Sequence, residues 1–231
     1  MVRFFADGEE LRADTVVLTG ENAQHAKVLR LKAGETVLVC DGQGTECLCE
    51  VTDAGEMKLN VLKRRESTSE AAVRVSVYMA FPKADKLEHV IQKATELGVA
   101  EIVAFPSARC VSRPDEKSIR KKLERWQKIA REACKQSGRC QMMAVDAPIA
   151  FPALLAALKT HEAAIVPWED ARGYSLTAFH REHPEIRDLA IVIGPEGGMS
   201  ADEIARMILT MCTPMSDFMY GQLIEVDGGS Q

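Results

Sequence analysis

The chain has 231 residues, of which 46% are hydrophobic and 27% are charged, so it can bury a core and form two modest domains. It has no apolar run near the roughly 20 residues of a membrane span, and its start, MVRFFADGEE, lacks a secretory layout. We therefore expect a cytoplasmic protein without a membrane partner. Its seven cysteines form no paired C-x-x-C knuckles, which predicts buried, reduced thiols and no metal site.

Residues 1–70 are predicted to form a small β-barrel or sandwich. Alternation in TECLCEV (45–51) puts Cys47, Cys49 and Val51 on one face of a strand. The stretches DGQG and DAG supply the Gly and Asp that tight hairpins need. A short helix ending at Gly34 is expected between the first two strands. The expected strands are 15–19, 35–41, 45–51 and 56–64.

A polar stretch without periodicity, KRRESTSEAA (63–72), is interpreted as a linker to a second domain, 73–231. In this domain strands alternate with helices, which is typical of a parallel sheet with helical crossovers. We therefore predict the α/β fold class for the chain. The expected strands are 73–81, 101–105, 162–168 and 189–193, and the expected helices are 87–97 and 116–137.

Positive charge is concentrated in the middle of the chain. Residues 73–139 have a balance of +7, against −4 for residues 1–72 and −8 for residues 140–231. The predicted helix 116–137 alone holds eight cations. A helix of this kind can contact a nucleic-acid backbone, but it can equally be a solvated surface, and the sequence leaves both readings open.

The stretch IVIGPEGGMSADEI (191–204) predicts a strand, a tight loop and a helix. Ser200 and Glu203 have the spacing of a capping box, so the helix is expected to begin at Ala201. Such a loop lies at the carboxyl edge of a parallel sheet, where open α/β folds bind ligands. Glu196 would repel a phosphate, which favours a neutral or cationic ligand. A glycine-rich turn with an exposed glutamate is an equally acceptable interpretation.

Six separated stretches together resemble the RsmE family of ribosomal RNA uridine methyltransferases, within the SPOUT (trefoil-knot) superfamily. QKATELGV and IGPEGG are the most specific of the matching segments. The stretches occur in the family's order and span about 200 residues. They are VRFFADG at the start, HAKVLRLKAGE (25–35), KADKLEHVIQKATELGV (83–99), RWQKIAREACKQSGR (125–139), WED (168–170) and IVIGPEGG (191–198).

The resemblance implies an N-terminal PUA-like β-barrel that binds RNA and a C-terminal SPOUT-type α/β domain that forms a homodimer. It implies methyl transfer from S-adenosyl-L-methionine to N3 of a uridine in small-subunit (16S) ribosomal RNA, either naked or in the assembled small subunit. Arg139 matches the arginine of the family's QSxR motif and is the expected catalytic residue, which anchors or stabilises the base. The residues expected at the cofactor are Glu169, Gly194, Pro195, Glu196, Gly197 and Gly198, and those expected to contact RNA are Arg3, Lys27, Arg30, Lys83, Lys86 and Lys93.

The resemblance ends near Glu203, where the family's knot-forming segment is absent, so the knot is expected to be incomplete. Residues 201–231 instead resemble the end of a short-chain dehydrogenase, with the tail GQLIEVDGG (221–229). The chain has no glycine-rich dinucleotide turn at its start and no Y-x-x-x-K pair, which argues against an oxidoreductase. A catalytically inactive RNA-binding homologue remains an alternative to the enzyme.

Overall fold

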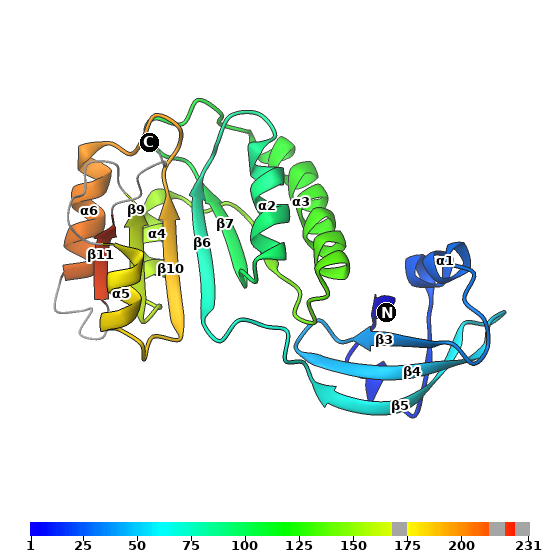
Figure 1. Ribbon diagram of the computed structural model, residues 1–231. Helices are drawn as coiled ribbons and strands as arrows, with labels where there is room; N and C mark the ends of the chain where they lie inside the picture. The colour runs from blue at the N-terminus through cyan, green and yellow to red at the C-terminus, as the bar shows by residue number, and fades with distance from the viewer. Residues whose placement is uncertain (168–174, 213–219, 225–231) are drawn as a thin grey trace, which may run out of the picture. The chain divides into compact units, whose positions relative to one another are not determined.

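The structure, a computed structural model, describes residues 1–167, 175–212 and 220–224 (Figure 1). The chain folds into two compact units. Unit 1 comprises Met1–Glu70 and Arg131–Met142, and unit 2 comprises Ala71–Ala130 and Met143–Gln231. Unit 1 thus includes a segment, Arg131–Met142, that lies within the predicted second domain.

Unit 1 is built on a five-stranded sheet in the order β1-β3-β4-β5-β2. Strand β1 runs parallel to β3, and the other neighbours are antiparallel. Cys47, Cys49 and Val51 are buried in its core, as the alternation predicted. The elements are β1 (Arg3–Phe5), a 3-10 turn η1 (Glu10–Arg12), β2 (Thr15–Val17), α1 (Gly20–Val28), β3 (Thr36–Cys40), β4 (Thr45–Asp53) and β5 (Lys58–Glu66).

Two predictions about unit 1 are wrong. The expected linker begins too early, because β5 continues to Glu66 and pairs Arg65 with Glu46 of β4, where their side chains form an ion pair. The expected helix does not reach Gly34, because α1 ends at Val28 and Arg30 takes the left-handed conformation that commonly closes a helix, with φ +55. The local sequence pattern indicates neither the end of β5 at Glu66 nor the end of α1 at Val28.

Unit 2 is built on a parallel six-stranded sheet in the order β11-β9-β10-β6-β7-β8. None of the helices in the described residues is both long and apolar enough to cross a bilayer. The elements are β6 (Arg74–Ala80), α2 (Lys86–Glu96), β7 (Glu101–Phe105), α3 (Glu116–Ser137), β8 (Ala144–Asp146), α4 (Phe151–Leu158), β9 (Ala163–Pro167), α5 (Leu176–Glu182), β10 (Asp188–Ile193), α6 (Ala201–Cys212) and β11 (Tyr220–Ile224).

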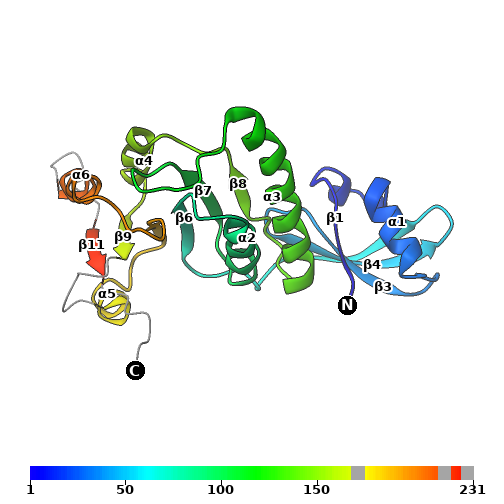
Figure 2. The same ribbon diagram turned by 90° about the horizontal axis from the view of Figure 1, so that it is seen from above.

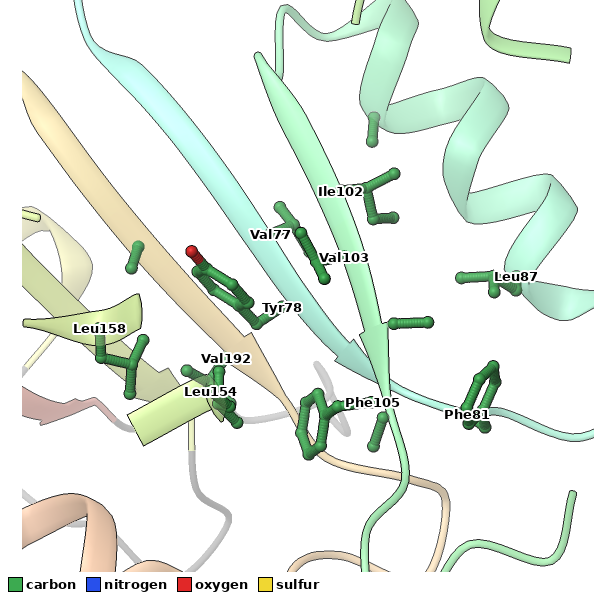
Figure 3. Close-up of a cluster of buried hydrophobic side chains, with 14 of the residues drawn as sticks. Val77, Tyr78, Phe81, Leu87, Ile102, Val103, Phe105, Leu154, Leu158 and Val192 are labelled. Atoms are coloured by element: carbon green, nitrogen blue, oxygen red, sulfur yellow. The ribbon is translucent and has the colours of Figure 1, made fainter. Parts of the chain in front are cut away.

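Helices cover both faces of this sheet because successive side chains of its strands are buried on opposite sides (Figure 2). In β9, Ala164 and Val166 belong to the main core together with Leu154 of α4, whereas Ala163 and Ile165 pack with Phe179 of α5. Figure 3 shows the same alternation in β7. There Ile102 points toward α2, and Val103 lies on the side of Tyr78.

The strand order places β10 between β6 and β9, so the chain reverses its direction across the sheet at this point. Ligands of open α/β folds bind where such a reversal leaves a crevice at the carboxyl ends of the strands. Beyond the loop after β10, the chain forms α6 and the edge strand β11, which pairs with β9 in parallel, and the likeness of residues 201–231 to a dehydrogenase tail stays a prediction. The expectation of an incomplete knot depends on the chain after Glu203, where residues 213–219 and 225–231 lie outside the described residues, so it stays a prediction.

Candidate functional site

The loop Gly194–Ser200 joins the carboxyl end of β10 to α6, as the sequence predicted. The backbone N–H of Gly198 donates to the Pro195 carbonyl at 2.8 Å and closes a turn, in which Gly198 has a φ of +66. Gly194 is required for a different reason: a Cβ there would lie 2.9 Å from Cγ of Met199. The two glycines therefore hold the loop tightly against the sheet.

A pocket of about 360 Å³ lies at this edge of unit 2. Its walls come from the ends of β9 and β10, the loop, the first turn of α6 and the loop after β7. Four of the five predicted cofactor residues in the loop line it, and Gly197 is absent from the lining. The lining residues are Arg109, Pro167, Ile193, Gly194, Pro195, Glu196, Gly198, Met199, Ala201 and Ile204.

The carboxylate of Glu196 is held by the turn that precedes α2. Its Oε1 accepts from Nζ of Lys86 at 2.9 Å and from the backbone N–H of Lys83 at 3.0 Å. The bond from Lys86, followed by that from Lys83, lowers the pKa of Glu196 to about 2. Ala84, between the two lysines, has a φ of +53, a strained value for alanine. The turn thus holds an ionised carboxylate at the pocket at neutral pH.

Arg109, in the loop after β7, is a pocket residue that the sequence analysis missed. Its Nη1 donates to the Gly197 carbonyl at 3.0 Å, and the residue is exposed at the pocket. It is the only cation that lines this pocket among the described residues. The sequence signal that could have identified Arg109 is its position after a predicted parallel strand, since loops at the carboxyl edge of a parallel sheet carry ligand contacts.

Glu203 joins two walls of the pocket. With Ser200 it forms the predicted capping box, in which Ser200 Oγ accepts from the Glu203 backbone N–H at 3.3 Å. Its carboxylate accepts from the backbone N–H of Ala108 at 2.8 Å and from the Ser107 hydroxyl at 3.1 Å. Burial alone raises the pKa of Glu203, but these hydrogen bonds outweigh it and leave the pKa lowered. The ionised side chain therefore fixes the Arg109 loop to α6.

Arg139 lies in unit 1 and is buried, with its side chain 5% exposed. Its Nε and Nη2 donate to Oε2 of Glu70 at 3.0 and 2.9 Å. Oε1 of Glu70 accepts from the backbone N–H groups of Cys140 and Gln141. The arginine is thus held in an ion pair that also fixes the turn after α3, and its catalytic role stays a prediction.

The six cations predicted to contact RNA have different surroundings. Arg3 is largely buried and pairs with Glu46 at 3.2 Å. Lys86 pairs with Glu196, and Lys93 with Glu96 at 2.7 Å within α2. The remaining three, Lys27, Arg30 and Lys83, are exposed. Glu169, the last predicted cofactor residue, lies outside the described residues.

One group in unit 1 has the side chains of a metal site. The ligand atoms of Cys40, Glu46 and Cys140 lie within 4.8 Å of one another and are buried. Nη1 of Arg3 contacts Sγ of Cys40 at 3.1 Å and Oε2 of Glu46 at 3.2 Å. The Arg3 guanidinium therefore already contacts two of these three side chains.

Comparison with known domain families gives two matches. An RNA methyltransferase domain matches residues 69–216, and an RNA methyltransferase PUA domain matches residues 18–62. The first match contains the pocket and the second lies within unit 1, from α1 to β5. Together they confirm the predicted PUA-like and methyltransferase parts of the fold.

Individual proteins give the same result. Ribosomal RNA small subunit methyltransferase E of Bacillus subtilis is 34% identical over 84% of this chain and 79% of its own. A crystal structure of the Neisseria gonorrhoeae methyltransferase E bound to S-adenosyl methionine is 25% identical, with a TM-score of 0.79 over 100% of this chain and 90% of that one. A Legionella pneumophila methyltransferase in complex with SAM has a TM-score of 0.78, 25% identity and the same 100% and 90% coverages.

These structures confirm the α/β class with a parallel-sheet, SPOUT-type domain. The family match covers more than half of the chain, and the curated relatives are matched over most of their length. The chain therefore belongs to the RNA methyltransferase family that includes ribosomal RNA small subunit methyltransferase E.

Proposed function

We propose that this chain transfers the methyl group of S-adenosyl-L-methionine to N3 of a uridine in small-subunit (16S) ribosomal RNA. The observation that carries the proposal is the pocket at the GPEGG loop, in a chain that matches a cofactor-bound methyltransferase E along its whole length. The names of the relatives support the small-subunit RNA as substrate. The choice of uridine N3 rests on the family resemblance.

The residues of the pocket fit this cofactor. Its volume of about 360 Å³ lies within the range of small-molecule sites, roughly 300–1,000 Å³. Ile193, Met199 and Ile204 provide an apolar wall suited to a nucleoside, and the charged Glu196 suits a sulfonium cation. A phosphate-bearing cofactor would meet that same carboxylate unfavourably.

The protein's contribution to the reaction is positioning and charge. When bound, S-adenosyl-L-methionine supplies an electrophilic methyl group. The uridine N3 must lose its proton to solvent before it can bond to the methyl group, so negative charge develops on the base. Arg109, which lines the pocket, is the proposed residue that stabilises that charge, and Arg139, held by Glu70, is the proposed residue that anchors the base.

Titration calorimetry with S-adenosyl-L-methionine, followed by methyl transfer to small-subunit RNA, separates the enzyme from an inactive RNA-binding homologue. We expect cofactor binding and transfer by the unsubstituted chain. RNA binding without cofactor binding would instead support the inactive homologue.

The roles of the two arginines are tested with Arg109→Gln, Arg139→Lys and the control Arg181→Gln, an exposed cation of α5. We expect a loss of kcat of at least about 100-fold in the first two, the scale seen when one charge-stabilising donor is removed. Circular dichroism must show native folding, since Arg139 is buried. Full activity of folded Arg139→Lys would remove its assignment.

We also propose that the chain acts in the cytoplasm as a homodimer on ribosomal RNA or on the assembled small subunit. Leu209 of α6 is 65% exposed, which is consistent with a surface covered by a second copy. Sedimentation equilibrium is expected to give twice the 25.4 kDa chain mass. A monomer at micromolar concentration that still transfers methyl groups would contradict the dimer.

A further inference from the structure

The cations of α3 fall on different sides of the helix. Trp126 and Ala130 are buried against unit 2. At about 100° per residue, Lys117, Lys121 and Lys128 point within about 40° of one direction, away from that buried side, and Arg120 borders them. All four are exposed. We refer to Lys117, Arg120, Lys121 and Lys128 as the α3 stripe.

Two flanking cations of the helix take part in its packing, whereas the stripe does not. Arg125 pairs with Glu88 of α2 at 2.6 Å, which joins the two helices that lie side by side in Figure 1. Lys122 is half-buried in a crevice beside Trp126. No cation of the stripe forms an ion pair with any residue that the structure describes. These four charges are thus available to a partner.

The stripe begins close to the pocket along the chain. The loop that carries Arg109 leads directly into α3, whose first turn follows at Glu116. From Lys117 to Lys128 the helix rises about 16 Å, enough to follow several phosphates of a nucleic acid. Two acids, Glu124 and Glu132, lie on the same exposed face, and Glu132 is paired with Lys135 at 2.9 Å, so the face keeps a positive balance.

We propose that the α3 stripe is the surface on which the phosphate backbone of the RNA substrate docks. This inference rests on the proposed function, because it supplies the positioning contacts for the base that enters the pocket. Contacts to phosphates fix the position of a nucleic acid without reading its sequence. The stripe therefore governs affinity and its salt dependence, and the pocket governs the choice of the methylated base.

The test compares two double variants with equal loss of charge. Lys121→Gln/Lys128→Gln removes half of the stripe. Lys159→Gln/Arg181→Gln removes two exposed cations, the C-cap residue of α4 and a residue of α5, the helices that precede the amino ends of β9 and β10. The dissociation constant for a small-subunit RNA transcript is measured by fluorescence anisotropy at several salt concentrations. Titration calorimetry measures S-adenosyl-L-methionine binding in parallel.

We expect the stripe variant to lose at least about 10-fold in RNA affinity near 150 mM salt. Its slope of log affinity against log salt should become shallower by about 1.4–1.8, from roughly 0.7–0.9 per lost phosphate contact. The control variant should bind RNA as the unsubstituted chain does, and cofactor affinity should be unchanged in both.

Equal RNA affinity and slope in the two double variants, whether both are retained or both reduced, would overturn the proposal and make α3 an ordinary solvated face. Failure of the unsubstituted chain to transfer methyl groups would instead count against the proposed function. The two failures are distinguishable because RNA binding is measured without the cofactor.

Discussion

Substitution of Glu203 tests how the pocket walls are held together. Glu203 is buried, with 7% of the residue exposed. Its carboxylate accepts four hydrogen bonds, from the backbone N–H and hydroxyl of Ser200, the hydroxyl of Ser107 and the backbone N–H of Ala108. Glu203→Ala leaves two backbone N–H groups without this acceptor, at about 1–3 kcal/mol each, and removes the capping box. We expect a loss of about 3 kcal/mol.

Thermal unfolding followed by circular dichroism measures this effect. For a chain of this size a loss of about 3 kcal/mol lowers Tm by roughly 6–12 °C. Glu203→Gln keeps one accepting oxygen and should lose about half as much. The control Asp202→Ala, which removes an exposed acid in the same turn, should cost less than about 1 kcal/mol. A Glu203→Ala protein as stable as Asp202→Ala would refute the reasoning.

The pH dependence of the Glu203 effect has a definite sign. Because its pKa is lowered in the folded protein, its contribution to stability is complete above the ordinary carboxyl pKa and is lost as pH falls through the lower folded value. The difference in Tm between the unsubstituted chain and Glu203→Gln should therefore shrink below about pH 4. A difference that persists unchanged into stronger acid would contradict this linkage.

Three further predictions concern the loop, its carboxylate and unit 1. Gly194→Ala should weaken S-adenosyl-L-methionine binding and lower the free energy of unfolding by about 1–3 kcal/mol, because the added Cβ would lie 2.9 Å from Cγ of Met199. The control Gly197→Ala, whose added Cβ has its nearest contact at 3.6 Å, should leave the free energy of unfolding nearly unchanged. Equal free energies of unfolding in the two variants would count against the close approach at Gly194. Since the pKa of Glu196 is about 2, calorimetry between about pH 3.5 and 8 should show no change in cofactor affinity from its protonation, and a loss with an apparent pKa near 4.5 is the opposing result. Glu70→Gln should destabilise unit 1 by about 2–3 kcal/mol in urea unfolding, because Arg139 loses its charged partner; an unaltered midpoint would mean that this ion pair is dispensable.

Regular elements could be predicted where the periodicity is strong and the ends are marked. The sequence predicts α3 at 116–137 and β7 at 101–105, and the structure has the same bounds. In α3 the apolar spacing persists over 22 residues, and Gly138 follows its end. The capping box of Ser200 and Glu203 involves residues only three apart, so the sequence predicted it as well.

Features that depend on a partner from elsewhere in the chain could not be predicted. Glu46 looks like a solvent-facing strand residue, yet it is buried because Arg3 and Arg65 neutralise it. Arg109 has no periodic or motif signal, and the fold alone brings it to the GPEGG loop. Arg139 matched a family motif, and nothing in the sequence indicated its bond to Glu70, 69 residues away.

The central claim is methylation of uridine N3 in small-subunit RNA. The most direct measurement is incubation of the purified chain with S-adenosyl-L-methionine and small-subunit RNA or small subunits that lack the modification, followed by nuclease digestion and mass spectrometry of the nucleosides. We predict 3-methyluridine at one site, dependent on the cofactor and reduced by Arg109→Gln. Methylation at another atom, or none on either substrate despite cofactor binding, would contradict the claim.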